Sequence, residues 1–208
     1  QDPTSIDRAR ELLERALAQD RQPETMVTLS YVYFLTGDVR ATTPEEKLAA
    51  YDKGREIGKR AVELAPRNPD AHVWYGINTG RWGQTKGIMR SLFLLPPVRE
   101  QVDTTLALDP KNLQALSLSG NVFFEVPRIA GGDREKAEAQ FRKALEIDPH
   151  FTVARVDLAR VLIATGRAAE ARRELQKVID ERQPNNVADW NVKDLPRARQ
   201  LLESLKGK

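Results

Sequence analysis

The feature that most constrains this chain is an internal repeat with helical spacing. In the segment 131–149, Ala137, Phe141, Ala144 and Pro149 follow one another at intervals of four, three and five residues. The first three slots recur 34 residues further on, at Ala171, Leu175 and Val178. A period of this length indicates paired helices that stack on their neighbours, because one pair cannot bury its apolar face alone.

Prolines mark where the helices of the repeat end. They stand at Pro66, Pro110 and Pro149, and the residue before a proline disfavours helical backbone. A small residue follows each of them ten positions later, at Gly76, Gly120 and Ala159, so one register holds for three repeats. The intervals between the prolines are 44 and 39 residues, which predicts insertions beyond a repeat of 34.

The alternation of small and large residues resembles the tetratricopeptide repeat (TPR). The small ones allow two helices to approach, and the large ones fill the space between successive pairs. The resemblance implies an all-α fold, a TPR-like right-handed α-solenoid of about four to five helix pairs with long insertions. We expect residues 1–208 to form a single repeat domain. The segment from Asp194-Leu195-Pro196 onward should be a C-terminal capping helix.

One inserted segment differs from its charged surroundings. Apolar residues crowd between Ile88 and Leu95 and are followed by Pro96-Pro97. The prolines predict a break, with a short apolar piece at 88–95 before a helix at 98–108. We interpret the insertion as a flap over the concave face of the array, although packing against a neighbouring repeat is the alternative.

Two other segments are more specific than the repeat itself. These are Trp74-Tyr75-Gly76 and the stretch Pro127–Asp133. They resemble the periplasmic TPR lipoproteins associated with TRAP-type transporters and the regulator-of-microtubule-dynamics family. The first resemblance implies a non-enzymatic accessory protein of an envelope transport system, with a transporter or envelope protein as partner. It also implies a periplasmic location, with the membrane reached only through a removed lipid anchor. A chain that begins at Gln1 fits this expectation, and a trimmed cytoplasmic chain is the alternative.

The first helix of each repeat lines the concave face of a TPR array, so the register predicts a ligand-binding surface. Its candidate residues on the helices of the repeats are Tyr31, Phe34, Leu35, Val73, Trp74, Ile77, Arg81, Asn121, Val156 and Arg160, and the inserted flap adds Met89 and Phe93. The surface is largely apolar, and its few polar groups would orient the head of an amphipathic ligand. Burial of the same residues as ordinary core is the alternative, since an apolar stripe at helical spacing usually packs inside.

Two functions fit such a surface. The favoured hypothesis is a carrier of a hydrophobic or amphipathic small molecule, such as a lipid or an organic acid. The alternative is a scaffold that receives a helix or peptide of a partner protein in an open groove. A clamp for a peptide carboxylate is disfavoured, because Ser117, Val153 and Asp157 occupy positions where cations would be needed.

Other classes of function find little support in the residues. The 33 basic and 30 acidic residues are interspersed, whereas a nucleic-acid site would cluster its cations. There is no cysteine, and His72 and His150 lie in different repeats, so we expect neither metal nor cofactor. Both histidines should lie at helix starts or on the surface. A nucleophile elbow is missing as well, and we expect no enzyme.

Trp190 should anchor the C-terminal cap, with a partner contact as its alternative.

Overall fold

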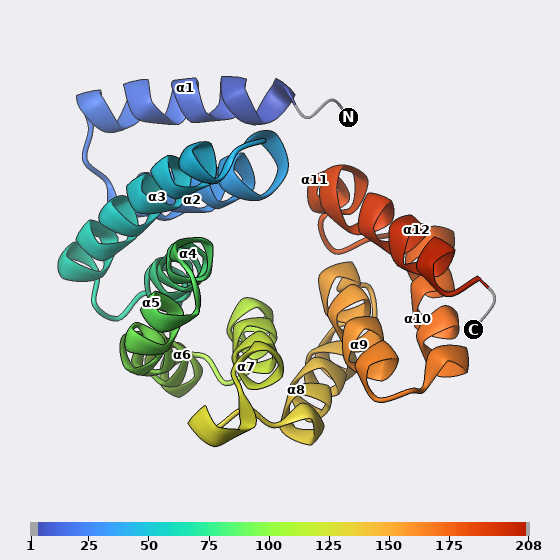
Figure 1. Cartoon of the computed structure of the whole chain (residues 1–208). Helices are drawn as coiled ribbons and strands as arrows, with labels where there is room; N and C mark the ends of the chain where they lie inside the picture. The colour runs from blue at the N-terminus through green and yellow to red at the C-terminus, as the bar shows by residue number, and fades with distance from the viewer. Residues whose placement is uncertain (1–3, 207–208) are drawn as a thin grey trace. The chain divides into compact units, whose positions relative to one another are not determined.

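The computed structural model describes residues 4–206, all of whose regular elements are helical. These residues fall into two compact units, 4–112 and 113–206. The predicted all-α, TPR-like fold is confirmed in each unit by successive helices that pack pairwise (Figure 1). No helix within 4–206 is both long and apolar enough to cross a membrane.

The first unit is built around four helices that pack one on the next. Helix α2 packs on α3, α3 on α4, and α4 on α6, while α1 lies against α2 and the short α5 lies against α4 (Figure 1). The elements in chain order are α1 (Thr4–Gln19), α2 (Pro23–Leu35), a π-helical turn (Thr36–Arg40), α3 (Pro44–Leu64), α4 (Pro69–Lys86), α5 (Ile88–Phe93) and α6 (Leu95–Leu108).

The second unit repeats the arrangement. Here α7 packs on α8, α8 on α9, α9 on α10, and α10 on α12. The elements are α7 (Leu113–Glu125), a 3₁₀ turn (Arg128–Ala130), α8 (Arg134–Ile147), α9 (Thr152–Ala164), α10 (Ala168–Asp180), α11 (Val187–Asp189), a π-helical turn (Trp190–Asp194) and α12 (Leu195–Ser204). The predicted capping helix is therefore present as α12.

The proline stops are confirmed. Helices α3, α6 and α8 end at Leu64, Leu108 and Ile147, just ahead of the three prolines. The helices also begin where the sequence provides caps. The Asp133 carboxylate accepts hydrogen bonds from the backbone N–H groups of Glu135 and Lys136 at the start of α8.

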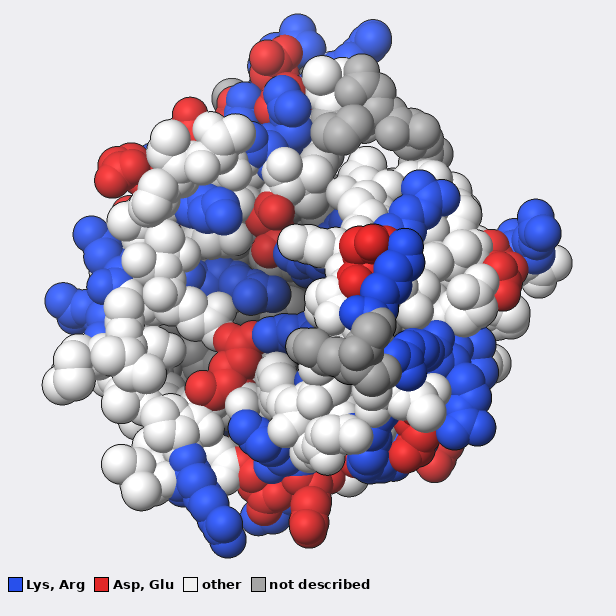
Figure 2. Space-filling view, turned by 45° about the vertical axis from the view of Figure 1, so that its right-hand side comes forward, with Lys and Arg blue, Asp and Glu red and all other residues white. Residues whose placement is uncertain are grey.

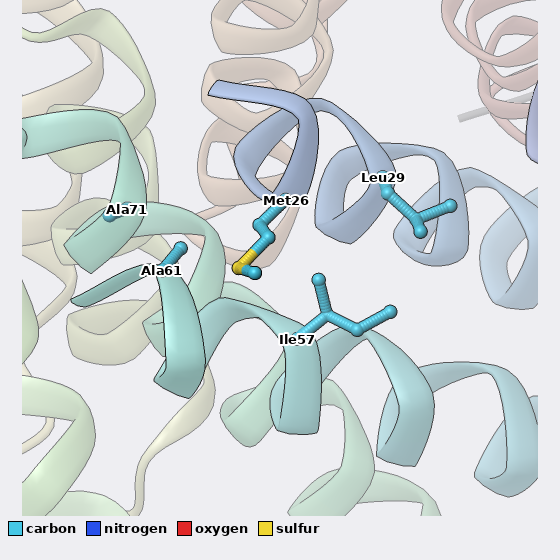
Figure 3. Packing of buried hydrophobic residues seen from close by; sticks show 5 residues of the cluster. All are labelled: Met26, Leu29, Ile57, Ala61 and Ala71. Carbon is cyan, nitrogen blue, oxygen red and sulfur yellow. The ribbon is translucent and has the colours of Figure 1, made fainter. Parts of the chain in front are cut away.

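Apolar side chains from three helices form the core of the first unit. Met26 and Leu29 of α2 meet Ile57 and Ala61 of α3, and Ala71 of α4 completes the cluster (Figure 3). All five are at least nine-tenths buried. In the second unit the small slots of the repeat are fully buried beside the large ones, as the alternation predicts: Ala137, Phe141, Ala144, Leu158, Leu162 and Leu175.

The structure corrects the boundaries of the inserted segment. The break lies at Gly87 and Leu94, and α6 begins at Leu95 and includes both prolines in its first turn. Prolines are tolerated there because the N–H groups of a first helical turn have no partner within the helix. Ahead of the C-terminal cap, the short helix α11 follows the end of α10.

Candidate functional site

In the first unit, aromatic residues gather where α2 and α4 meet. The Tyr31 and Trp74 ring centroids are 4.6 Å apart, and those of Phe34 and Trp74 are 5.7 Å apart, both in tilted arrangements. The Arg81 guanidinium lies 6.0 Å from the centre of the Phe34 ring. Phe34 and Trp74 are buried, whereas Tyr31 and Arg81 are half-buried. Tyr31 and Arg81 are thus the partly exposed residues of a surface whose base is the packed core.

A buried polar network fixes α2, α3 and α4 beneath this surface. The Ser30 hydroxyl donates to the carbonyl of Gly54 at 2.8 Å. The Asn78 amide donates to the Ser30 carbonyl, the Ser30 hydroxyl and the Trp74 carbonyl at 3.0 to 3.1 Å. Such a network is stabilising when its donors are satisfied, because an unpaired polar group costs free energy in a core. The sequence reasoning missed Asn78, although a polar residue on an apolar helix face was a usable signal.

The remaining candidates of the first unit separate into core and surface. Leu35 and Val73 are buried, and Ile77 is half-buried. Met89 and Phe93 of α5 are 77% and 72% exposed, so these two side chains extend into solvent. The candidates predicted from the sequence therefore lie in three environments: buried, half-buried and exposed. Their contact with a ligand stays a prediction.

In the second unit the polar candidates bind one another. The Arg160 guanidinium donates to Asn121 Oδ1 at 3.1 Å, and the Asn121 amide donates to Asp157 Oδ2 at 2.8 Å. Arg160 also forms ion pairs with Asp157 at 3.0 Å and with Glu125 at 2.8 Å. Val156, the last candidate in this unit, is buried.

This network explains the electrostatics of Arg160. Burial opposes its positive charge, but the carboxylates of Asp157 and Glu125 outweigh that effect and raise the pKa of Arg160 above its ordinary value. The guanidinium also lies 5.1 Å from the centre of the Phe124 ring. Arg160 and Asn121 are committed to internal carboxylates, so an incoming anion would have to compete with Asp157 and Glu125.

The two histidines have local partners. Buried His72 on α4 contacts the Gln101 side-chain oxygen at 2.7 Å and the Pro66 carbonyl at 2.9 Å. The prediction of a helix-start position holds for His72, but a surface position does not. His150 precedes α9 and lies 3.1 Å from a carboxylate oxygen of Glu181. Within residues 4–206 no group of three His, Asp or Glu side chains is arranged to hold a metal ion.

The C-terminal cap contains a buried polar cluster that the sequence reasoning missed. The Trp190 indole donates to the Val178 carbonyl at 2.7 Å, which fits its predicted role as an anchor. Nearby, the Thr152 hydroxyl donates to Asp194 Oδ2 at 2.7 Å, and Lys193 lies 3.4 Å from a carboxylate oxygen of Asp189. Burial raises the pKa of Asp194 above its ordinary value, although Lys193 and Thr152 act in the opposite direction.

Comparison with known proteins identifies the family. The family model described as regulator of microtubule dynamics protein 1-3 matches residues 1–206. The chain belongs to this family. It is 25% identical over 187 residues to regulator of microtubule dynamics protein 3 of Bos taurus, covering 81% of this chain and 39% of that protein. It is 29% identical over 160 residues to regulator of microtubule dynamics protein 1 of Pongo abelii, covering 68% and 51%. The chain thus spans about half or less of the length of these relatives.

The fold has relatives among solved structures. A thermophilic TPR protein of Thermus thermophilus, TTC0263, has a TM-score of 0.70 at 23% identity and covers 95% of this chain and 91% of its own. A structure of MamA has a TM-score of 0.51 at 16% identity, with 95% and 91% covered. Both likenesses support the TPR fold.

The predicted location is wrong. The expected periplasmic site came from the resemblance to transporter-associated lipoproteins. The family model instead describes regulators of microtubule dynamics, and the curated relatives named above come from animals, which have no periplasm. The cytoplasmic alternative fits these relatives better. The error has a simple cause, since the resemblance rested on a repeat pattern that reports the fold and not the location.

Proposed function

We propose that this chain is a non-enzymatic protein-interaction module in which the surface formed by Tyr31, Ile77 and Arg81 receives a segment of a partner protein. The observation that carries the proposal is the aromatic cluster of α2 and α4. Buried Trp74 and Phe34 hold a half-buried Tyr31 and a nearby cation in fixed positions. Preorganised aromatic and arginine side chains are the residues that dominate binding energy in protein interfaces.

The family supports a scaffold over our first hypothesis of a small-molecule carrier. The curated relatives are named as regulators of microtubule dynamics, and the fold is one that commonly binds protein segments. In the second unit, Arg160 and Asn121 already bond to internal carboxylates, which makes them poor groups for holding the head of a free organic acid. We infer that the partner belongs to the microtubule cytoskeleton.

Co-pelleting with stabilised microtubules tests the proposal. We expect the purified chain to pellet with microtubules, and Ile77→Asp or Tyr31→Ala to weaken binding about tenfold or more, as loss of a contact at an interface centre does. Leu64→Asp serves as the matched control, because Leu64 lies at the end of α3 and is already 58% exposed. Circular dichroism and the urea midpoint show whether each variant is folded.

Three results would contradict the proposal. If the wild-type chain stays in the supernatant, the microtubule partner is wrong. If Leu64→Asp weakens binding as much as Ile77→Asp, the assigned surface is wrong. If native mass spectrometry finds an apolar molecule retained by the purified chain and lost in Ile77→Asp, the carrier hypothesis replaces the scaffold.

A further inference from the structure

The short helix α5 presents three large apolar side chains to solvent. Ile88, Met89 and Phe93 are 62%, 77% and 72% exposed. Residues that line a groove are partly covered by its walls, whereas side chains exposed to this extent protrude. We call Ile88, Met89 and Phe93 the apolar tip. Exposed apolar residues concentrated on one short element indicate a surface kept for interaction.

The rest of α5 is firmly seated. Leu92, Leu94 and Leu95 are half-buried, and Gly83 of α4 lets the two helices approach closely. A Cβ atom at Gly83 would lie 3.1 Å from Leu94 Cδ1 and 3.3 Å from the Ser91 Cα. The apolar tip is therefore the outer face of a packed helix, so its exposure follows from the packing of the opposite face.

The sequence on both sides of the tip contains cations and lacks acidic residues. From residue 71 to residue 99 the sequence contains no Asp or Glu, although acidic residues number 30 in the chain. Lys86 and Arg90 flank the tip and are exposed, and within residues 4–206 neither forms an ion pair. Arg90 lies 5.7 Å from the centre of the Phe93 ring. The local charge is suited to an anionic surface.

An aromatic ring lies among these cations, and Arg90 is near both this ring and the Phe93 ring. The Trp82 ring centre is 4.5 Å from the Arg55 guanidinium, 5.5 Å from the Lys86 ammonium and 5.9 Å from the Arg90 guanidinium. Apolar side chains with tryptophan and cations beside them match the layers of a membrane interface, where acyl chains meet anionic headgroups.

We propose that α5 is a membrane-docking element that inserts the apolar tip shallowly into an anionic lipid surface. Lys86 and Arg90 then contact the headgroups, and Trp82 lies at the level of the interface. A protein pocket for the tip would leave the acid-free stretch unexplained, and an acidic peptide would leave three protruding apolar side chains in water. A lipid surface accounts for both. This inference uses other residues than the partner surface proposed above: both involve α4, but Tyr31, Ile77 and Arg81 take no part in the membrane site.

Flotation with vesicles tests the membrane proposal. We expect the chain to float with phosphatidylcholine vesicles that contain about 30 mol% phosphatidylserine and to float weakly with pure phosphatidylcholine, because cations near a membrane are attracted by anionic lipid. Met89→Ser with Phe93→Ser should reduce flotation about tenfold or more, since it removes the inserted apolar area. Leu12→Ser is the matched control, because Leu12 is an exposed apolar residue of the same unit but lies on α1.

A spectroscopic signal locates the contact. Lipids brominated in the upper acyl chain should quench part of the tryptophan fluorescence of vesicle-bound protein. Trp82→Phe should remove most of that quenching while the chain still floats, because Trp74 is buried and Trp190 lies in the C-terminal cap. Quenching that persists in Trp82→Phe places the contact elsewhere and overturns the proposal.

Other results would show that the apolar tip binds something other than a lipid surface. Failure of the wild-type chain to float with anionic vesicles overturns the proposal. A concentration-dependent dimer that Met89→Ser with Phe93→Ser dissolves assigns the tip to a second copy. Loss of microtubule co-pelleting in that double variant assigns the tip to the protein partner. A chain that floats but does not pellet with microtubules refutes the proposed function and leaves the membrane inference standing.

Discussion

At the scale of single residues, Gly54 of α3 leaves no room for a Cβ atom, whereas Gly80 of α4 does. A Cβ at Gly54 would lie 2.5 to 2.7 Å from three atoms of the Asn78 side chain, which three hydrogen bonds hold in place. A Cβ at Gly80 would meet only Val98 Cγ2 at 3.9 Å. The first glycine is required by packing, and the second is not.

We therefore predict opposite effects of the same substitution. Gly54→Ala should lower the free energy of unfolding by about 1–3 kcal/mol, because overpacking outweighs the gain in helix propensity. Gly80→Ala should raise it by roughly 0.5–1 kcal/mol through that propensity alone. Urea unfolding measures both. In an Asn78→Ala background Gly54→Ala should cost less, and an unchanged cost would show that the clash with Asn78 is not the cause.

Asp194 gives the chain a specific pH dependence. Burial raises the pKa of its carboxyl group, with Lys193 opposing and Asp189 and Asp157 adding to the shift. In the unfolded chain this carboxyl releases its proton near its ordinary pKa of about 4, whereas the folded chain retains the proton to a higher pH. The folded state then binds more protons, so this contribution to stability falls as the pH rises from about 4 through the folded pKa.

Asp194→Asn should remove the loss of stability that the Asp194 carboxyl group causes as the pH rises. Its amide oxygen replaces Asp194 Oδ2 as acceptor of the hydrogen bond from Thr152, and the side chain carries no charge to bury. We predict that the variant and the wild type have similar stability below about pH 4, and that the variant becomes progressively more stable at higher pH. Urea unfolding across a pH series gives the difference. A wild type that gains on the variant as pH rises would mean that Lys193 stabilises the ionised carboxylate.

At the scale of helices and turns, the sequence predicts what depends on short spacings. The stops before Pro66 and Pro110 and the cap at Asp133 follow from backbone chemistry within a few residues, and the structure confirms them. The sequence does not predict which residues far apart in the chain contact one another. From the sequence alone, Asn121 and Arg160 could belong either to a free binding site or to an internal ion-pair network. Only the fold shows that Asp157 and Glu125 lie beside them.

The start of α3 offers a prediction at this scale. The Thr43 hydroxyl accepts from the Glu46 N–H at 3.2 Å, and the Glu46 carboxylate accepts from the Thr43 N–H at 3.2 Å. This reciprocal cap begins the helix that carries Gly54 and Ile57. Thr43→Ala should lower the free energy of unfolding by about 1 kcal/mol, whereas Thr43→Ser should change it little. Equal losses for both would assign the effect to the Thr43 methyl group and not to the cap.

At the scale of the molecule, net charge is a poor guide to where anionic partners bind. The excess of basic over acidic residues is only +3, and Figure 2 shows the two signs interspersed over the face in view. Against that mixed background, the absence of Asp and Glu between residues 71 and 99 is a local departure that composition does not reveal. The binding properties of this chain should follow its local charge pattern.

Two variants of equal net charge distinguish the local from the global effect. Lys86→Gln with Arg90→Gln and Lys53→Gln with Lys59→Gln each remove two cations, leaving 31 basic and 30 acidic residues. Lys53 and Lys59 are exposed on α3 and form ion pairs with Glu56 and Glu63, so their charges are already balanced. We predict that Lys86→Gln with Arg90→Gln lowers flotation with anionic vesicles about tenfold or more and makes flotation less dependent on salt. Lys53→Gln with Lys59→Gln should leave flotation and its salt dependence unchanged, because the attraction between a cation and anionic lipid falls off within a Debye length of about 8 Å. Equal losses in the two variants would mean that vesicles attract the whole molecule by its net charge, and α5 would then have no special role.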